Sequence, residues 1–367
     1  MNVSEKKQPR ICIVSDQLAT GGAERCAATL SIFLEKNNCK VHHVIVVDKI
    51  EYDFAGEVLN LGKLKNQSNG FYNRLNRFKV LKQFFKKNKF DYIIDFRVKR
   101  HALQEFYIAK YIYKSPLIVA VHSFMTNLYF PKSKLLANTI YSHCFKIVAV
   151  SKAIHDKIKS EFSYSNIETI YNPIDFKLIE KASNENLKLN YKYILAVGRM
   201  QDSVKQFDVL IDCYAASNLP KQSIKLVLLG DGLLKKKLES QVARLNLQDF
   251  ILFEGKVANP FPYYKQALYS VLTSRNEGFP TVLLESLTCE TPVVAFDCFS
   301  GPSEIIINQE NGILVENQNQ EKLIVAMNEM ASNEELYNNC KANAKASVKQ
   351  FSIDMIGKQW LELIKIN

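Results

Sequence analysis

Short runs of apolar and β-branched residues alternate with longer amphipathic stretches along most of the chain. In the first half, the short runs predict strands at residues 11–15, 41–47, 92–96, 117–121, 147–150 and 168–171. The stretches between them predict helices around residues 23–36, 71–87, 101–113, 133–143 and 151–161. This alternation is typical of a parallel sheet with helices on both faces.

The alternation is interrupted once and then resumes. Asn172-Pro173-Ile174-Asp175 predicts a turn, because proline fixes its own φ and disfavours helical backbone before it. A polar stretch over residues 177–192 follows. Further strands are predicted at residues 193–197, 224–229, 250–254, 270–273, 292–295 and 312–315, and residues 320–366 predict three helical pieces. We therefore expect two doubly wound α/β domains in tandem, with ligands at the carboxyl ends of the strands and a cleft between the domains.

The expected domain limits follow from the same pattern. An N-terminal domain is predicted over residues 1–175, a linker over 176–192 and a second domain over 193–345. A C-terminal helix over residues 346–367 can pack back on the N-terminal domain. The length of 367 residues and the hydrophobic fraction of 47% are sufficient for two cores.

The composition indicates the cellular compartment and disfavours several kinds of site. No apolar run approaches the roughly 18 to 20 residues needed to span a bilayer. Residues 1–10 are polar and charged, without the apolar core of a secretory signal, so we expect a cytoplasmic protein. The eight cysteines are scattered without a CxxC pair, which disfavours a zinc site or a disulfide framework and predicts small core residues. We expect no metal, no cofactor and no nucleic-acid partner.

The positive charge is concentrated in the first half. Residues 1–175 hold 27 lysines and arginines against 15 aspartates and glutamates, whereas the remainder holds 21 against 22. Within residues 70–90, basic residues accompany an apolar stripe at helical spacing. The basic residues are Arg74, Arg77, Lys79, Lys82, Lys86, Lys87 and Lys89, and the stripe is Phe71, Leu75, Phe78, Leu81 and Phe85. This helix either docks peripherally on an anionic membrane surface or packs on the sheet with its lysines solvated.

The segment from Glu277 to Glu285 carries the strongest chemical pattern. Pro280 suits the first position of a helix, where its missing N–H costs nothing. The amides after it are predicted to point out of the helix end and favour a diphosphate; they belong to Thr281, Val282 and Leu283. Glu285 is then suited to the vicinal hydroxyls of a ribose, and Glu277 to the sugar side of the phosphate. In the alternative interpretation, both glutamates are only surface charges favourable to the helix dipole.

Three further sites follow predicted strands. Gly198 and Arg199 close the strand at residues 193–197, and Lys205 follows where a helix begins, which supplies two permanent cations for a diphosphate. In the first domain, the Gly21-Gly22 pair joins the first strand to the first helix and lets backbone amides approach a phosphate. His122 ends the strand at residues 117–121, where it either faces the cleft or is structural. No GxGxxG or GxxxxGK motif is present, which disfavours a dehydrogenase and a P-loop enzyme.

Together these stretches resemble the GT-B glycosyltransferases of the retaining family 4 (glycosyl transferases group 1), which includes bacterial polysaccharide and lipid-linked oligosaccharide transferases. The matching stretches span nearly the whole chain in the order of the family. They are GGAER at 21–25, VH at 121–122, VSK at 150–152, IYNPID at 170–175, VGRM at 197–200 with Lys205, LGDG at 229–232, FEGKV at 253–257, SRNEGFPTVLLES at 274–286, TPVVAFD at 291–297, GPSEII at 301–306 and NGILV at 311–315.

The resemblance implies a fold, an activity and a set of site residues. The fold is GT-B, two Rossmann-like domains facing a central cleft. The activity is transfer of a hexose or N-acetylhexosamine, with retention, from a nucleotide sugar (for which the resemblance indicates UDP) to a glycan or lipid-linked acceptor. The resemblance assigns the diphosphate to Arg199 and Lys205, the ribose to Glu285, the donor sugar to Glu277 and His122, the base to the backbone around Lys256 and Val257, and a phosphate contact to Gly21 and Gly22, with Gly198, Gly278 and Phe279 completing the donor site.

Two positions depart from the family pattern, and one functional alternative stays open. Gln206 and Glu290 stand where the family usually has glycine, which costs on the order of 1 kcal/mol if the backbone there has positive φ. No Asp-X-Asp triplet occurs, so we expect activity without a metal ion. No side chain suggests a covalent nucleophile, which fits a front-face mechanism. The alternative is a non-catalytic protein that binds nucleotide sugars or glycans on the same fold.

Overall fold

The computed structural model describes residues 8–67 and 70–365, which form two compact units. Unit 1 comprises the chain up to Pro173 together with the segment from Ile353 onwards. Unit 2 comprises Ile174–Ser352. The chain therefore leaves unit 1, builds unit 2 and returns to unit 1 with its last helix.

Unit 1 is built on a seven-stranded parallel sheet with the order β3-β2-β1-β4-β5-β6-β7. The strands are β1 (Arg10–Ser15), β2 (Lys40–Ile45), β3 (Glu57–Asn60), β4 (Tyr92–Asp95), β5 (Leu117–Val121), β6 (Lys146–Ala149) and β7 (Ile167–Thr169). The strand order reverses between β1 and β4, which makes their carboxyl ends the topological switch point where ligands of such sheets bind. The six predicted strands are confirmed, and the edge strand β3 was not predicted.

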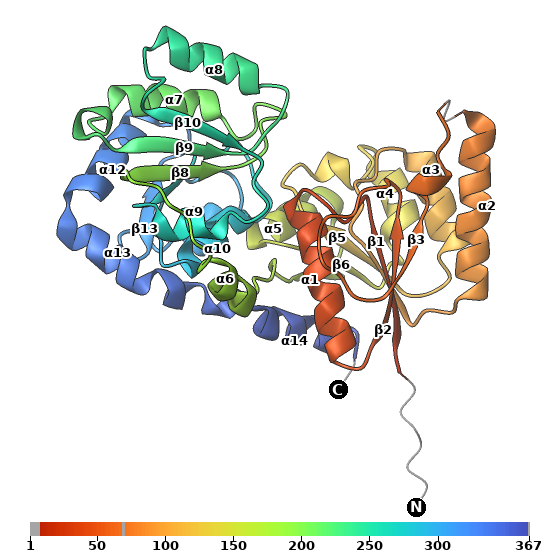
Figure 1. Ribbon diagram of the computed structural model, residues 1–367. Coiled ribbons are helices and arrows are strands. Elements are labelled where there is room, and N and C mark those ends of the chain that lie inside the picture. The colour runs from red at the N-terminus through yellow and green to blue at the C-terminus, as the bar shows by residue number, and fades with distance from the viewer. Residues whose placement is uncertain (1–7, 68–69, 366–367) are drawn as a thin grey trace, which may run out of the picture. The chain divides into compact units, whose positions relative to one another are not determined.

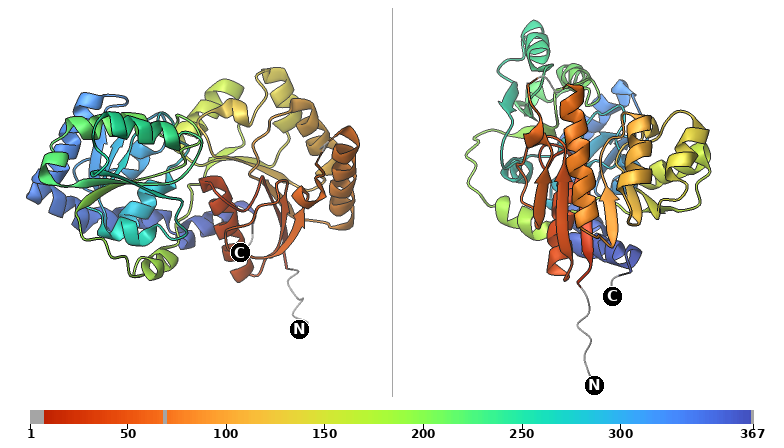
Figure 2. Two further views of the ribbon diagram at one scale, coloured as in Figure 1. Left: turned by 45° about the horizontal axis from the view of Figure 1, so that its top comes forward. Right: turned by 90° about the vertical axis from the view of Figure 1, so that its right-hand side faces the viewer.

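Helices cover both faces of this sheet (Figures 1 and 2). They are α1 (Gly22–Lys36), α2 (Phe71–Lys87), α3 (Ala102–Tyr107), the π-helical turn η2 (Ile108–Ile112), α4 (Lys134–Tyr141), α5 (Lys152–Phe162) and α14 (Ile353–Leu363), with short 3-10 turns η1 (Gly62–Leu64) and η3 (Thr126–Leu128). The helix predicted around residues 101–113 is confirmed over residues 102–112, and its second half is a π-helix rather than an α-helix. No helix in residues 8–67 and 70–365 is both long and apolar enough to cross a membrane.

The final helix α14 packs against α1, the first helix of the chain (Figure 1). Ile356, Trp360 and Leu363 are buried in one core with Leu30 of α1 and the strands. Gly357 allows the two helices to approach closely, because a Cβ atom there would collide with the ring of Phe33. Each buried side chain of this size contributes about 1.5–3 kcal/mol relative to exposure, so the return of the chain stabilises unit 1.

Helix α2 has the predicted limits, but its apolar stripe is divided. Leu81 and Phe85 are buried, as a helix packed on the sheet requires. Phe71 and Leu75, in the first half of the helix, are 71% and 48% exposed. The stripe therefore anchors only the second half of α2.

Unit 2 contains a six-stranded parallel sheet with the order β10-β9-β8-β11-β12-β13. The strands are β8 (Tyr193–Val197), β9 (Lys225–Leu229), β10 (Ile251–Gly255), β11 (Ser270–Leu272), β12 (Val293–Phe296) and β13 (Gly312–Val315), and all six confirm predicted strands. Counted within the unit, the order is the same as that of the first six strands of unit 1. The switch point lies between β8 and β11.

Helices α7, α8 and α12 pack on one face of this sheet around a large apolar core, and α6, α9 and α10 pack together on the other (Figure 1). The helices are α6 (Phe176–Ala182), α7 (Phe207–Ala216), α8 (Lys235–Arg244), α9 (Phe261–Gln266), α10 (Thr281–Thr288), α11 (Pro302–Ile305), α12 (Gln320–Ser332) and α13 (Glu334–Ser347), with 3-10 turns η4 (Pro220–Gln222) and η5 (Lys349–Phe351). Helix α6 lies in the stretch predicted as a linker. Its N-cap is Asp175, whose carboxylate accepts from the Leu178 amide at 3.0 Å.

Candidate active site

The candidate site of unit 2 lies where β8 and β11 end. These two strands are neighbours in the sheet, so the loops that follow them emerge side by side at the switch point. Gly198 and Arg199 directly follow β8, and the loop after β11 leads to Glu277. Topology therefore brings the predicted cations and the first predicted glutamate to one place.

An ion pair joins the two loops. The ammonium nitrogen of Lys205 lies 2.7 Å from a carboxylate oxygen of Glu277, and the two side chains are only 18% and 13% exposed. The aliphatic part of Lys205 lies over Gly198, whose missing side chain leaves room for it; a Cβ atom there would stand 3.1 Å from Lys205 Cγ. The glycine, the lysine and the glutamate are thus one packed group.

The backbone around Lys205 is held by the loop after β11. The Thr273 hydroxyl donates to the carbonyls of Lys205 at 2.9 Å and Gln206 at 3.2 Å. The Arg275 amide donates to the Val204 carbonyl at 2.8 Å. Sequence reasoning missed Thr273, although a threonine at the carboxyl end of a strand is a signal for such a bond.

Arg199 is the uncommitted charge of the site. Its side chain is exposed and makes no hydrogen bond or ion pair within residues 8–67 and 70–365. Lys205 and Glu277 neutralise each other, so Arg199 leaves the cluster with one net positive charge. An anion of the size of a diphosphate fits this charge balance.

Helix α10 begins next to Glu277, and its first turn is less open than predicted. Thr281 and Val282 are half-buried, but the Leu283 amide donates to the Pro280 carbonyl at 3.1 Å. The prediction that Leu283 offers a free amide is therefore wrong, because the first turn of the helix closes a short bond on itself. The remaining amides and the helix dipole still favour an anion at this end.

Gly278 and Phe279, which precede Pro280 and helix α10, hold the start of the helix in place. The Gly278 carbonyl accepts from the Ser300 hydroxyl at 2.6 Å, and Phe279 is buried against the ring of Phe351 at 5.1 Å between centroids. Gly301, with φ of 99°, has no room for a Cβ atom beside Pro280. The loop after β12 thus fixes where α10 starts. Sequence reasoning missed Ser300.

Glu285 lies in the second turn of α10 and is buried. The Tyr264 hydroxyl donates to its carboxylate at 3.3 Å. A buried carboxylate held by a neutral donor keeps acceptor capacity for further hydroxyl groups, as a ribose would supply.

The loops after β9 and β10 complete this edge of the sheet. Gly230 approaches the backbone of Gly198 so closely that a Cβ atom would collide with its carbonyl, and the Gly230 amide donates to Gly255 at 2.7 Å. Lys256 is exposed and Val257 is half-buried just beyond. The residues predicted in this unit therefore follow three strands, β8, β10 and β11, at one edge of the sheet.

The predicted glycine pair of unit 1 lies between β1 and α1. Gly21 has φ of 134°, and its amide donates to the Tyr52 hydroxyl at 3.2 Å. A Cβ atom at Gly21 would collide with the carboxylate of Glu24. The predicted open amide of Gly21 is therefore already used, whereas Gly22 is exposed at the start of the helix.

His122 follows β5, as predicted, and lies against the ring of Phe96 at 5.0 Å between centroids. Both ring nitrogens are buried, and the side chain of Asn172 lies near the ring. Burial and the charge of Lys99 lower the pKa of His122 to about 3, so the ring is neutral near pH 7.

Both departures from the family pattern have left-handed backbone. Gln206 has φ of 48° and Glu290 has φ of 62°. The positive φ on which the predicted cost depended is therefore confirmed at both positions. Each of the two residues costs on the order of 1 kcal/mol relative to glycine. Gln206 is also buried, with a side-chain oxygen that has no partner in the described structure.

Two family models match adjacent parts of the chain. Residues 20–178 match the model described as Glycosyltransferase Family 4. Residues 179–347 match the model described as Glycosyl transferases group 1. Between them the models include every residue of the candidate site.

Two relatives and one solved structure illustrate the similarity. The chain is 29% identical over 369 residues, 95% of this chain and 97% of the relative, to the N-acetylgalactosamine-N,N'-diacetylbacillosaminyl-diphospho-undecaprenol 4-alpha-N-acetylgalactosaminyltransferase of Campylobacter jejuni. It is 26% identical over 361 residues, covering 97% and 99%, to the amylovoran biosynthesis glycosyltransferase AmsD of Erwinia amylovora. The structure of Anabaena HepE in complex with UDP-glucose has the same fold, with a TM-score of 0.79, 21% identity and coverage of 97% and 99%.

Proposed function

Because the chain belongs to the glycosyl transferases of group 1 and family 4, with the GT-B fold, we propose that it transfers a hexose or N-acetylhexosamine from a UDP-sugar to a glycan or lipid-linked acceptor. The observation that carries the proposal is the pair of cations at the switch point of unit 2. Arg199 is exposed and uncommitted, and Lys205 is held in place by Glu277.

These residues have distinct proposed roles. Arg199 and Lys205 bind the diphosphate and stabilise the charge that develops on it as the bond to the sugar breaks. Glu277 holds the Lys205 ammonium and accepts from a hydroxyl of the donor sugar. Glu285 accepts from the ribose hydroxyls, and backbone around Lys256 meets the base. The start of α10 adds its dipole to the two cations.

We propose that the anomeric configuration of the sugar is retained. The leaving phosphate then accepts the acceptor's proton on the same face of the sugar, so no enzyme nucleophile is needed. We also propose that no metal ion is required, because Arg199 and Lys205 are permanent cations that can stabilise the leaving group.

The acceptor proposal rests on the relatives. One relative acts on a diphospho-undecaprenol-linked sugar, and the other takes part in amylovoran biosynthesis. We propose an acceptor of the same kind, within the assembly of a surface polysaccharide or glycoconjugate.

The test is a panel of nucleotide sugars screened for nucleotide release, with and without a lipid-linked acceptor. Transfer of labelled sugar is expected with one UDP-sugar, unchanged by EDTA, and proton NMR of the product should show the donor's anomeric configuration. Binding of the donor without release or transfer would support the non-catalytic alternative. Loss of activity in EDTA that Mg²⁺ or Mn²⁺ restores would contradict metal independence.

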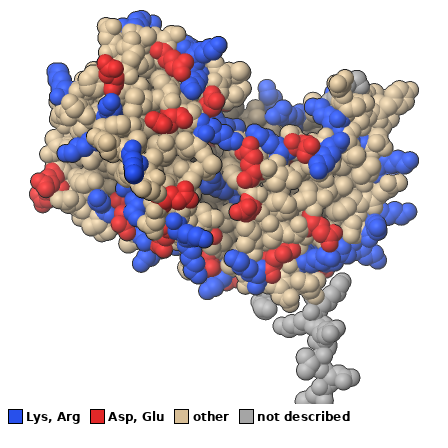
Figure 3. Space-filling model, viewed as in Figure 1, with Lys and Arg blue, Asp and Glu red and all other residues tan. Residues whose placement is uncertain are grey.

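We further propose that α2 docks unit 1 on an anionic membrane at the inner face of the cytoplasmic membrane. Lysine and arginine side chains gather along α2, at the right-hand edge of Figure 3. Next to them, Tyr72 of α2 is 86% exposed and Leu103 of α3 is 80% exposed. The rings of Phe78 and Tyr107 lie 6.2 Å apart between centroids, so α2 and α3 pack against each other. Basic residues near an anionic surface contribute about 1 kcal/mol each.

Sedimentation with vesicles at two salt concentrations tests this docking. The protein should bind vesicles that contain anionic lipid, and this binding should weaken as the salt concentration rises. It should not bind neutral vesicles. Replacing Lys79 and Lys82 by glutamate should abolish binding, whereas the same change at Lys236 and Lys237 of unit 2 should not. Equal binding to neutral vesicles would contradict the proposal.

A further inference from the structure

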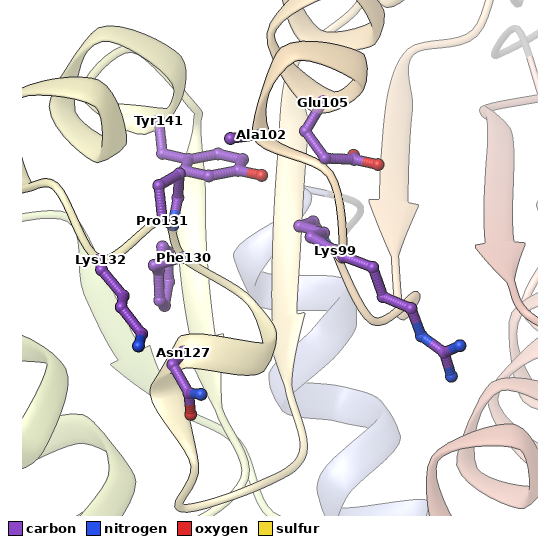
Figure 4. Close-up of a pocket in the computed structure, with 9 residues that line it drawn as sticks. Lys99, Ala102, Glu105, Asn127, Phe130, Pro131, Lys132 and Tyr141 are labelled. Atoms are coloured by element: carbon purple, nitrogen blue, oxygen red, sulfur yellow. The ribbon is translucent and has the colours of Figure 1, made fainter.

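A pocket of about 190 Å³ opens inside unit 1, and none of the residues assigned above lines it. It is lined by Lys99, Arg100, Ala102, Glu105, Asn127, Phe130, Pro131, Lys132 and Tyr141. Figure 4 shows Lys99 and Glu105 on one side and the residues of the 127–141 segment on the other. The hydroxyl of Tyr141 is directed across the pocket toward the first side.

The wall behind Glu105 is a buried group of charges that neutralise one another. The Arg97 guanidinium contacts Asp95 at 2.7 Å and Glu105 at 3.0 Å. The Lys99 ammonium lies 3.7 Å from Asp95 and donates to the Arg97 carbonyl at 3.0 Å. Two cations and two carboxylates balance, so the carboxylate of Glu105 is compensated by Arg97 and does not make the pocket negative.

The opening of the pocket adds positive charge that the wall does not balance. Arg100 and Lys132 are exposed, and neither makes a hydrogen bond or an ion pair among the residues that the structure describes. The amide group of Asn127 is exposed beside them. An occupant of this pocket therefore meets two free cations.

Tyr141 is the second, independent sign of a ligand. Its side chain is about 1% exposed, and its hydroxyl has no hydrogen-bond partner within the described structure. Burial, with the charges of Glu105 and Asp95 nearby, raises the pKa of Tyr141, so the hydroxyl remains a donor. A buried donor without a partner is unfavourable unless something supplies an acceptor.

Donors dominate the polar side chains of the lining, although Asn127 also brings an amide oxygen that accepts. Arginine and lysine only donate, the Tyr141 hydroxyl lacks an acceptor, and the one carboxylate is committed to Arg97. A sugar hydroxyl both donates and accepts and would find few acceptors here, whereas phosphate oxygens only accept. Arginine beside lysine is a common arrangement for phosphate.

We propose that this pocket binds a phosphate or diphosphate group, and that the group is the diphosphate of the lipid-linked acceptor. The first part stands on the pocket alone. The second part rests on the proposed function, since it identifies which substrate carries the group.

Calorimetric titration with inorganic pyrophosphate tests the first part. The full chain carries Lys205→Ala in every sample, which weakens the proposed diphosphate site of unit 2. Combined Arg100→Ala and Lys132→Ala should weaken binding at least about 10-fold. Lys134→Ala, an exposed lysine close to Lys132 that does not line the pocket, should change the affinity less than about twofold.

Tyr141→Phe gives the sharper result. The ring still packs against Phe130, at 5.5 Å between centroids, so the fold is retained. Affinity should fall about 10-fold, the range for one hydrogen bond to a charged group, while the melting temperature holds or rises because an unpaired buried hydroxyl is gone. Unchanged affinity in Tyr141→Phe, equal weakening by Lys134→Ala, or equally tight binding of succinate would overturn the pocket assignment.

Competition identifies the source of the phosphate. A soluble isoprenyl diphosphate should displace pyrophosphate from the pocket, and vesicles of phosphatidylglycerol should not. The opposite result would overturn the acceptor assignment in favour of a phospholipid headgroup. Because these measurements need no transfer reaction, a protein without transferase activity that still binds pyrophosphate would refute the proposed function and leave the pocket intact.

Discussion

The two units share a strand order and differ in what they place at the switch point. In unit 2, the loops after β8 and β11 hold Lys205 against Glu277 and leave Arg199 exposed and uncommitted. In unit 1, the segment after β4 holds Arg97 between two buried carboxylates, Asp95 and Glu105. The same topology thus places an uncommitted charge directly after β8 in unit 2 and a buried group of mutually neutralised charges after β4 in unit 1. Strand order alone does not determine the charge at a switch point.

Removing the central charge of the unit 1 cluster should have the largest effect on stability. Arg97→Ala leaves the buried carboxylate of Glu105 unpaired and leaves Asp95 with only its 3.7 Å contact to Lys99, which costs about 3–5 kcal/mol. Trp360, the single tryptophan of the chain, is buried in unit 1 and reports its unfolding by fluorescence. The urea midpoint should fall sharply, whereas Arg244→Ala, at an exposed arginine of unit 2, should leave it unchanged. A midpoint equal to wild type in Arg97→Ala would show that the cluster does not stabilise unit 1.

Acid should destabilise unit 1 more than unit 2, because all six histidines of the chain lie in unit 1. Burial lowers the pKa of His43 to about 4 and that of His122 to about 3, whereas an unfolded histidine titrates near 6.5. Below pH 6.5 the unfolded state binds more protons, so the free energy of unfolding falls as pH decreases. From pH 6.5 to pH 5 each histidine should remove at most about 2 kcal/mol.

Hydrogen exchange at pH 7 and pH 5 checks this expectation region by region. Protection in β2 and β5 should fall, and protection in β8, β9 and β12 should fall much less. His122→Gln should reduce the loss in β5. Equal loss of protection in both units would contradict a role for the buried histidines.

A smaller effect is expected from Glu285, the buried carboxylate of α10. Glu285→Gln keeps the shape of the side chain but removes the charge from its bonds to the donor. The KM for the donor should rise about 10-fold with kcat little changed, since this contact is made equally before and during the reaction. Glu290→Gln, five residues later and exposed, is the control and should behave as wild type. A fall in kcat without a change in KM would assign Glu285 to the chemical step.

The smallest effect concerns backbone strain. Glu290 has φ of 62°, which glycine adopts without steric cost. Glu290→Gly should therefore raise the stability of unit 2 by up to about 1 kcal/mol, measured as a shift in thermal midpoint, with activity unchanged. Glu304→Gly, in a helix, should destabilise. A loss of stability in Glu290→Gly would mean that its long contact with Lys345 outweighs the strain.

The sequence predicted the elements well because apolar runs and amphipathic stretches are local signals. Strand β3 was not predicted because it is a four-residue edge strand that is exposed or half-buried throughout. The helix at Phe176–Ala182 was not predicted because its polar composition resembled that of a linker, although Asp175 is an N-cap signal. The division of the α2 stripe was not predicted because periodicity shows which residues share a face of a helix, but not which part of that face is covered.

The site was predicted as a set of positions after strands, and the structure adds the contacts between them. The pairing of Lys205 with Glu277, 72 positions apart, depends on β8 and β11 being neighbours, which no local pattern encodes. The Leu283 amide is closed by a bond within its own turn, and the Gly21 amide by Tyr52. The pocket beside Tyr141 is lined by residues from two loops and from α3, η3 and α4, and no motif marks it.

The account depends most on the two cations of unit 2, and steady-state transfer by two variants tests them directly. Arg199→Ala and Lys205→Ala should each lower turnover about 10²-fold or more, the range for removing one donor from a developing negative charge. Lys236→Ala, at an exposed lysine of α8, should retain wild-type turnover. Near-normal turnover in both site variants, with the fold of unit 2 intact, would contradict the assignment of the donor diphosphate to this switch point.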